Sequence, residues 1–172
     1  MNLQSNDFEL FGVPMRFAQD RPGIDARWKT LQREAHPDRF AAQGAAAQRI
    51  AMQWSVRINE AYQRLRDPLK RAGYLCELHG APVQAENNTA MSGSFLMQQI
   101  AWRESLDDAG DAAELDALAR EVAREREKAL TACEHLIDDA GDFAAAAQQV
   151  RALMFIQRFE DDVQDRIDRL GQ

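Results

Sequence analysis

The stretch "LQREAHPDRFAAQG" (residues 31–44) interrupts a helical pattern with a histidine, a proline and an aspartate. Proline pushes the residue before it out of the helical region, so a helix that carries Leu31 must end near His36. Apolar residues recur at helical spacing before and after the stretch, at Ile24, Trp28, Leu31 and Ala35 and then at Ile50, Trp54, Ile58, Ala61 and Leu65. These positions predict a hairpin of two helices, with residues 36–44 as the loop at its tip.

The remaining segments also predict helices. A short helix fits the stretch "NDFELFG" (residues 6–12), with Asp7 as its candidate cap and Gly12 as its end, and Pro68 restarts the chain after the hairpin. The polar, turn-rich segment "HGAPVQAENNTAMSG" is typical of a linker. Apolar patterns at 95–106, 115–136 and 150–170 follow, and the short breaks between them favour antiparallel neighbours.

The expected fold is therefore all-α and has two domains. We place an N-terminal helical-hairpin domain at residues 1–79 and a linker at residues 80–93. A C-terminal antiparallel three-helix bundle is expected at residues 94–172.

The charge balance argues against two classes of partner. The 172 residues hold 21 Lys and Arg against 28 Asp and Glu, a net charge of −7. An acidic protein is a poor nonspecific ligand for nucleic acid or for an anionic membrane. No apolar run approaches the roughly 20 residues that span a bilayer, and no secretory signal is visible, so we expect a cytoplasmic protein.

Catalysis would require partners that the sequence does not place beside the tripeptide. His36 and Asp38 are suited to acid–base chemistry, but no nucleophile, metal cage or glycine-rich phosphate loop lies near them. The plainest interpretation of "HPD" is a helix end followed by a turn. We expect no enzymatic activity.

Two Cys and His pairs raise the question of a metal. Cys76 precedes His79, and Cys133 precedes His135. The second pair would point about 200° apart on a helix, which does not suit one ion. Both cysteines continue apolar faces and are better read as small core residues. We expect no metal and no cofactor.

A cationic flank leads to the predicted tip. At about 100° per residue, Lys29, Arg33 and His36 share one flank of their helix, whereas Arg27 lies on the opposite flank. Cations beside a proline-stiffened loop, within an acidic protein, are typical of a docking surface for an acidic partner. Ordinary surface charge is the alternative.

The first C-terminal helix has more apolar surface than one core requires. Phe95, Trp102 and Leu106 form one face, and about 100° around from it lie Leu96, Met97 and Ile100. Phe155 is displaced by about 120° from the apolar face of the last helix. An exposed apolar patch of this kind marks a protein-binding site, unless a wide bundle core absorbs both faces.

Longer stretches resemble a known family. The segments "DFELFGVP", "LQREAHPDRF", "INEAYQRLRDPLKRAGYLCELHG", "FLMQQIAWRESL" and "VRALMFIQRF" are similar to J-domain co-chaperones of the HscB type, which serve iron–sulfur cluster assembly. The resemblance covers nearly the whole chain. Ala35 stands where an aromatic residue is common in the family, and Arg39 replaces the frequent lysine.

This resemblance implies two partners and a role in protein complex oligomerization. The N-terminal domain, as a J-domain, would bind a DnaK-class ATPase chaperone (HscA type) and stimulate its ATP hydrolysis through His36, Pro37, Asp38, Arg33, Lys29 and Arg39. The C-terminal helices would carry the scaffold protein (IscU type) and assist cluster transfer, using Leu96, Met97, Ile100, Phe155, Arg103 and Glu104. The alternative is a general J-protein for unfolded clients, which usually carries a glycine-rich linker or cysteine repeats.

Overall fold

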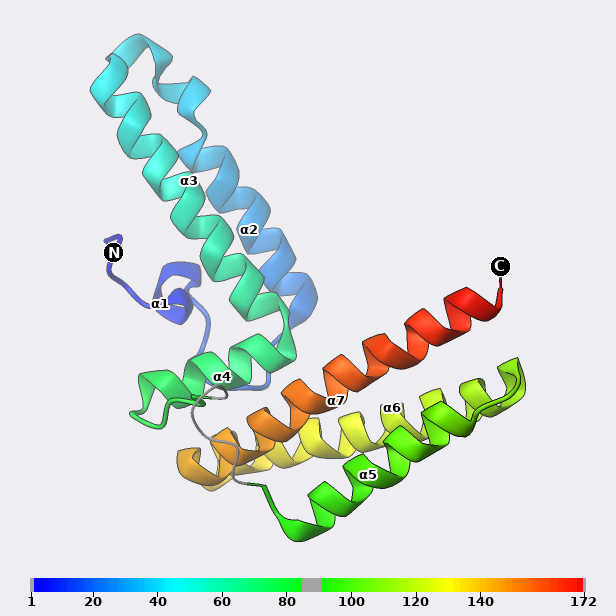
Figure 1. The fold of residues 1–172 in the computed structure, drawn as a ribbon. Coiled ribbons are helices and arrows are strands. Elements are labelled where there is room, and N and C mark those ends of the chain that lie inside the picture. Colours follow the sequence, from blue (N-terminus) through cyan, green and yellow to red (C-terminus); the bar gives the residue numbers. More distant parts are fainter. Residues whose placement is uncertain (1, 85–90, 172) are drawn as a thin grey trace. The chain divides into compact units, whose positions relative to one another are not determined.

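The computed structural model describes residues 2–84 and 91–171, and every regular element in these two ranges is helical (Figure 1). The chain divides into two compact units, Met1–Leu75 and Cys76–Gln172. The division falls inside helix α4 (Pro68–Leu78), a few residues before the domain end that the sequence suggests. Part of the expected linker, residues 85–90, lies outside the described residues.

The centre of the N-terminal unit is the predicted hairpin. Helices α2 (Arg21–Ala35) and α3 (Ala45–Arg66) run antiparallel (Figure 1). The predicted loop at residues 36–44 connects them, and the structure adds that Pro37–Gln43 within it form a 3-10 helix. Pro37 has the φ angle that a first helical turn needs, and His36 caps that turn.

The facing sides of the hairpin are apolar, as the sequence predicts, except near the tip. Leu31 and Ile58 are buried, and the ring of Trp28 stacks on Tyr62 with centroids 4.6 Å apart. Ile50 was expected on this buried face, but 55% of it is exposed. The expectation fails because helical spacing gives the direction of a side chain and does not show whether another element covers it.

Helix α1 (Asp7–Phe11) begins one residue earlier than the sequence suggests. Its cap is Asn6, whose side chain accepts a hydrogen bond from the Glu9 amide, while the Glu9 carboxylate reaches back to Asn6. Gly12 ends the helix with a φ of 65°, in the left-handed region that favours glycine. Asp7 is therefore not the cap, and its carboxylate is used elsewhere.

The Asp7 carboxylate is buried against two arginines of α3. It lies 2.9 Å from Arg57 Nη2, and Arg64 binds it through two hydrogen bonds of 2.6 and 2.8 Å. The Asp7 amide donates to the hydroxyl of Tyr74 on α4, over whose ring the Arg64 guanidinium lies. One residue, Asp7, thus joins α1 to α3 through its carboxylate and to α4 through its amide, and the hydrogen bonds of the carboxylate raise the pKa of Arg64.

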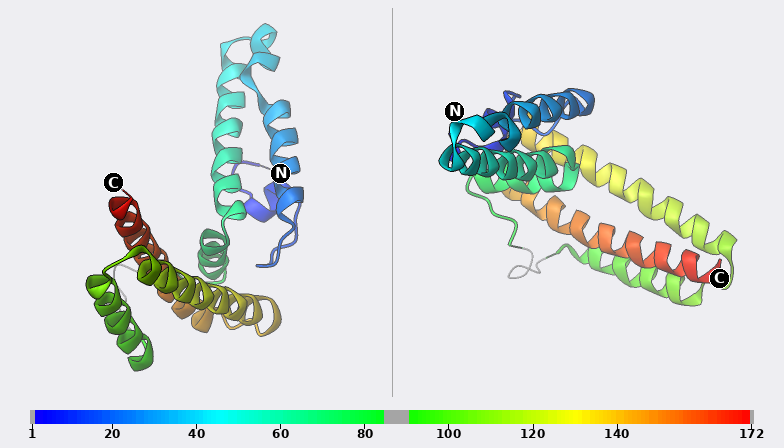
Figure 2. Two further views of the ribbon diagram at one scale, coloured as in Figure 1. Left: turned by 90° about the vertical axis from the view of Figure 1, so that its right-hand side faces the viewer. Right: turned by 90° about the horizontal axis from the view of Figure 1, so that it is seen from above.

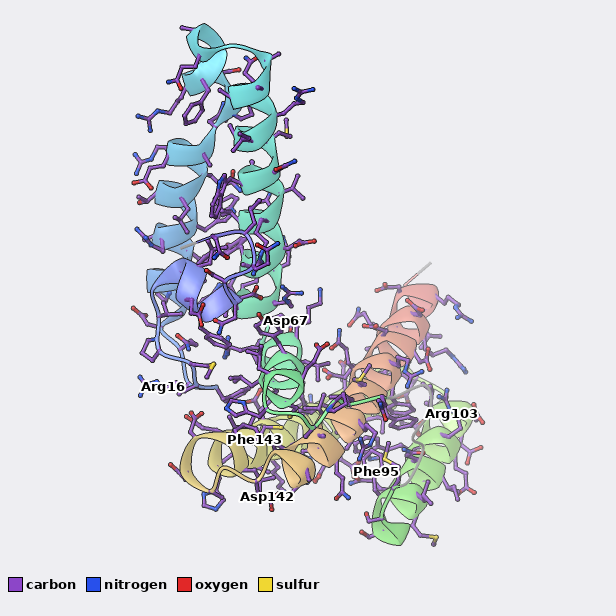
Figure 3. The ribbon with its side chains drawn as sticks, turned by 90° about the vertical axis from the view of Figure 1, so that its left-hand side faces the viewer. Arg16, Asp67, Phe95, Arg103, Asp142 and Phe143 are labelled. Carbon is purple, nitrogen blue, oxygen red and sulfur yellow. The ribbon has the colours of Figure 1, made fainter. Side chains whose placement is uncertain are left out.

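The turn into α4 is also held by side chains. Asp67 lies between α3 and α4 (Figure 3) and accepts hydrogen bonds from the amides of Leu69 and Lys70. The buried Arg71 donates through Nε to the carbonyl of Phe17 at 2.7 Å. This bond ties the segment between α1 and α2 to α4.

The C-terminal unit is an antiparallel three-helix bundle, as predicted. Its helices are α5 (Gly93–Asp108), α6 (Ala112–Glu134) and α7 (Phe143–Leu170), and α6 and α7 lie side by side in both views of Figure 2. A π-helical turn, His135–Asp139, extends α6. The core is built from Trp102, Leu106, Leu115, Leu118, Val122, Cys133, Ile137, Val150, Leu153, Ile156, Phe159 and Val163.

The two short breaks of the bundle share one design. Each ends in an aspartate that caps the next helix, Asp111 at the amide of Glu114 and Asp142 at the amide of Ala145. Gly141 precedes the second cap with a φ of 62°, which permits the tight reversal. The chain can therefore turn within three residues and set consecutive helices antiparallel.

Both cysteines are buried free thiols, in agreement with their prediction as core residues. Burial raises the pKa of Cys76 to about 11 and that of Cys133 to about 12, so both stay protonated near neutral pH. His79 stacks on Phe143 with ring centroids 3.8 Å apart.

Within residues 2–84 and 91–171, no three His, Cys, Asp or Glu side chains gather as a metal site would require. None of the helices described there is long and apolar enough to cross a bilayer.

We expect Asp7→Asn to lower the free energy of unfolding by about 3 kcal/mol or more, because it leaves two partly buried guanidinium groups without their counter-charge. The exposed carboxylate of Glu60, on the same helix as the two arginines, is the control, and Glu60→Gln should change stability by less than about 0.5 kcal/mol. Urea unfolding of the two variants measures the difference. Equal stabilities would show that the buried cluster does not hold α1 in place.

Candidate functional sites

The tip of the hairpin presents a short, hydrogen-bonded loop. His36 follows the last residue of α2, and its Nδ1 accepts a hydrogen bond from the Asp38 amide at 3.2 Å. The Arg39 amide donates to the His36 carbonyl at 3.0 Å. The Asp38 carboxylate is 91% exposed, and its Oδ2 lies 3.7 Å from the same Nδ1. The loop therefore offers a carboxylate and an imidazole to solvent on a constrained backbone.

The cations predicted for this site are exposed. Lys29 and Arg33 lie one turn apart on α2, and Arg39 lies on the 3-10 helix, where its Nη1 donates to the Arg33 carbonyl at 3.4 Å. Among the described residues, none of the three forms an ion pair with a carboxylate. Arg27, the residue expected on the other flank, is half-buried. The cationic groups near the loop are thus available to an acidic partner.

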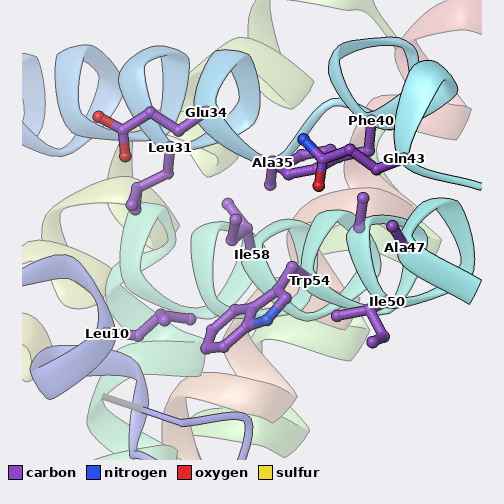
Figure 4. A pocket seen from close by; sticks show the side chains of 11 residues that line it. Leu10, Leu31, Glu34, Ala35, Phe40, Gln43, Ala47, Ile50, Trp54 and Ile58 are labelled. Carbon is purple, nitrogen blue, oxygen red and sulfur yellow. The ribbon is translucent and has the colours of Figure 1, made fainter.

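An apolar cavity of about 520 Å³ lies beneath the loop, between α2 and α3 (Figure 4). Helix α1 closes one end of it through Leu10, and the 3-10 helix closes the other through Phe40. The lining residues are Leu10, Leu31, Glu34, Ala35, Phe40, Gln43, Ala47, Ile50, Ala51, Trp54 and Ile58. Ala35 contributes only a methyl group to this space.

The second apolar face of α5, formed by Leu96, Met97 and Ile100, is exposed. Leu96 is 45%, Met97 68% and Ile100 55% exposed, whereas Trp102 and Leu106 on the other face are buried in the bundle. Because the two faces point in different directions around the helix, the bundle covers one of them only. A cluster of large exposed apolar side chains is the usual mark of a protein-binding surface.

Phe155 lies in a different setting from these three residues. It is half-buried on α7, packs edge-on against Phe95 with centroids 5.8 Å apart, and lies 6.3 Å from Phe159. Trp102 stacks on Phe159 at 5.5 Å. These four rings join α5 to α7, so Phe155 contributes to packing as well as to the surface. The sequence did not single out Phe159, although the spacing of four residues from Phe155 placed both on one face.

Arg103 and Glu104 lie beside the exposed face of α5. Arg103, labelled with Phe95 in Figure 3, pairs with Asp162 of α7 at 3.1 Å and lies over the ring of Phe159. Glu104 is exposed. Asp162 carries no signal in the sequence that would assign it to this face, because only the packed bundle brings α7 next to Arg103. The face thus has an apolar centre and charged neighbours, the usual composition of a protein interface.

Known proteins resemble the chain over its whole length. A family model of the HSCB C-terminal oligomerisation domain matches residues 91–164. The co-chaperone protein HscB homolog of Burkholderia thailandensis is 50% identical over 173 residues, which cover 99% of this chain and 98% of that protein. The chain belongs to the HscB co-chaperone family. A homolog from Cupriavidus taiwanensis is also 50% identical, over 98% of this chain and 97% of that protein.

Solved HscB structures agree with the fold. Chaperone HscB from Vibrio cholerae has a TM-score of 0.85 and 34% identity, with 96% of this chain and 99% of that chain covered. Human co-chaperone HscB has a TM-score of 0.90 at 22% identity, covering 96% and 84% of the two chains, and so supports the fold alone. The fold prediction is confirmed: an HscB J-domain with its helical hairpin, and a C-terminal three-helix bundle.

The cavity beneath the loop yields a stability prediction. Ala35→Leu should raise the free energy of unfolding by about 1 kcal/mol, because the added carbons fill apolar space at little cost in helix propensity. Ala46→Leu, at an exposed position of α3, is the control and should leave stability within about 0.5 kcal/mol. Thermal and urea unfolding measure both. Destabilisation by Ala35→Leu alone would mean that the side chain cannot enter the cavity.

Proposed function

We propose that this HscB-family co-chaperone binds an iron–sulfur scaffold protein of the IscU type and delivers it to a dedicated DnaK-class chaperone of the HscA type. It stimulates the ATPase of that chaperone and thereby assists cluster transfer. The observation that carries the proposal is the identity of 50% with HscB co-chaperones over 99% of the chain. The protein acts in the cytoplasm, catalyses no reaction itself and needs no metal or cofactor.

The geometry of the J-domain tip supports the chaperone contact. Lys29, Arg33 and Arg39 surround an exposed loop and are unpaired with carboxylates in the described part of the chain. Positive side chains on a protein of net charge −7 favour an encounter with an acidic surface. Because Pro37 and the loop hydrogen bonds restrict the backbone already, binding loses less conformational entropy.

The exposed face of α5 supports the scaffold contact. Leu96, Met97 and Ile100 are suited to the centre of an interface, and the unbranched Met97 adapts to an uneven partner surface. Arg103 and Glu104 provide charged groups beside them. A general J-protein for unfolded clients would use such a face without selecting one folded scaffold, so the scaffold distinguishes the two functions.

The decisive experiment is the steady-state ATPase of the HscA-type chaperone with this protein, with the IscU-type scaffold, and with both. We expect stimulation by this protein alone and a more than additive rate with both. An unfolded client protein in place of the scaffold should not give this synergy. Equal synergy from the unfolded client would favour the general J-protein, and no stimulation at all would contradict the proposal.

The cationic flank gives a prediction of its own. Arg33→Glu should weaken chaperone stimulation more than Arg27→Glu does, because only Arg33 lies on the flank of the loop. Stimulation at subsaturating co-chaperone concentration measures the effect. The gap between Arg33→Glu and the wild type should narrow as salt is raised from 50 to about 500 mM, because salt screens exposed charges. Equal losses from the two variants would place the contact elsewhere.

A second prediction concerns the scaffold surface. The combined change Leu96→Ala, Met97→Ala and Ile100→Ala should weaken scaffold binding more than about tenfold, because central apolar anchors each contribute about 2 kcal/mol. The melting temperature should change little, since all three side chains are exposed. Calorimetric titration with the scaffold measures binding.

Two control variants separate binding from folding in that experiment. Leu170→Ala removes a leucine that is 49% exposed on α7, away from the face, and should leave scaffold binding unchanged. Phe155→Ala should lower the melting temperature, because its ring packs against Phe95 and Phe159. If the triple α5 variant melts early instead, its side chains hold the bundle together and the scaffold site lies elsewhere.

A further inference from the structure

The ring of His36 takes part in the backbone geometry of its own loop. A backbone amide can only donate, so the 3.2 Å contact from the Asp38 N–H requires a lone pair on His36 Nδ1. The neutral imidazole then carries its proton on Nε2. The two ring nitrogens therefore have different tasks, since Nδ1 faces the loop backbone and Nε2–H remains a donor.

This contact is a helix cap. His36 is the residue before the 3-10 helix Pro37–Gln43, and Pro37 has no N–H of its own. The Asp38 amide is therefore the first donor of the helix that needs an acceptor, and His36 Nδ1 provides it. Because the contact fixes the Asp38 amide, it also restricts the direction of the Asp38 side chain.

Arg39 adds two further restraints to the same loop. Its amide donates to the His36 carbonyl at 3.0 Å, and its Nη1 donates to the Arg33 carbonyl in the last turn of α2 at 3.4 Å. The Asp38 side chain is 91% exposed, and its Oδ2 lies 3.7 Å from His36 Nδ1, which is too long for a hydrogen bond. The loop thus holds its backbone and leaves one carboxylate open to a partner.

We propose that His36 is a positioning residue, which acts on the chaperone through Asp38 by capping the Asp38 amide with Nδ1. The inference rests on the proposed function and deepens it, because it assigns the partner contact to the Asp38 carboxylate and the backbone cap to the imidazole. A direct contact of His36 with the chaperone would instead use Nε2, the nitrogen that faces away from the loop backbone.

Two amide side chains separate the tasks of the two nitrogens. Asparagine carries its oxygen two bonds from Cβ, where His36 has Nδ1, and it is among the best capping residues. Glutamine carries its amide one bond further out, near the position of Nε2. His36→Asn therefore keeps the cap and loses the outer donor, whereas His36→Gln keeps an outer donor and loses the cap.

The test is the concentration of co-chaperone that gives half-maximal stimulation of the chaperone ATPase. Loss of a cap shifts a local equilibrium about fivefold, so His36→Gln and His36→Ala should raise this concentration about fivefold or more. His36→Asn should raise it less than about twofold, with the maximal rate retained. His135, an exposed histidine of the C-terminal unit, is the matched control, and His135→Asn and His135→Gln should have no effect.

A second measurement reads the cap directly, without the chaperone. Hydrogen exchange at the Asp38 amide of the free protein should be slow in the wild type and in His36→Asn, and faster in His36→Gln and His36→Ala. In the ATPase assay, Asp38→Ala combined with His36→Ala should be no worse than Asp38→Ala alone, since one residue acts through the other.

The outcomes that would overturn the inference are distinct. A His36→Asn variant as weak as His36→Ala, or a His36→Gln variant as good as the wild type, would show that Nε2 makes the decisive contact. Additive losses in the His36 and Asp38 pair would show two independent contacts. If the wild-type protein gives no stimulation of the chaperone ATPase, the proposed function fails and this inference fails with it. The ATPase rate with the wild-type protein alone therefore separates that failure from a failure of the inference.

Discussion

The buried carboxylate of Asp7 is the interaction on which the J-domain depends. A charge without contact to water is tolerated only when cations and donors surround it, and here Arg57 and Arg64 of α3 do so. The same residue donates its amide to Tyr74 of α4. Three helices are thus joined at one point, and the hairpin of α2 and α3 is held from its base. A hairpin held in this way can present its tip as a fixed shape.

The two candidate surfaces differ in polarity and would bind their partners through different interactions. The J-domain tip is polar and mostly exposed, and its shape comes from hydrogen bonds within the loop, so it suits a contact that depends on charge and on geometry. The face of α5 is apolar, and its three exposed side chains would gain free energy by leaving water. A co-chaperone that meets one partner transiently and carries another would need one surface of each kind.

The cavity beneath the tip gives the J-domain a local weakness. Ala35 contributes only a methyl group to the space between α2 and α3, and Ile50 in the lining of that space is 55% exposed. Apolar side chains that line unfilled space lose dispersion contacts, so the upper hairpin is less well packed than the other end of the hairpin, where Ile24 and Leu65 are fully buried. The loop must then rely on its own hydrogen bonds, which gives the caps by His36 and Arg39 more weight.

Much of the molecule could be predicted from local patterns. Pro37 limits the residue before it, which ends α2 at Ala35, and the helical spacing of apolar residues identifies α3, α5, α6 and α7. The breaks at 109–111 and 140–142 are short enough to require antiparallel neighbours. The excess apolar surface of α5 is likewise visible in the spacing of Leu96, Met97 and Ile100, because one helix face can hold only one stripe.

The errors arise where a residue's surroundings come from distant segments. Asp7 reads as a helix cap, yet it is buried because Arg57 and Arg64 reach it from fifty residues away. Ile50 follows the helical spacing of the core but is 55% exposed, which spacing along one helix does not reveal. Phe155 packs on Phe95 because α7 lies beside α5. The sequence by itself determined the long helices, the end of α2 and the residues at the tip, all of which follow from helical spacing and from the conformational limits of neighbouring residues. Only the tertiary structure decided which charges are paired, which apolar groups are covered and where space remains, because burial is a property of elements packed together.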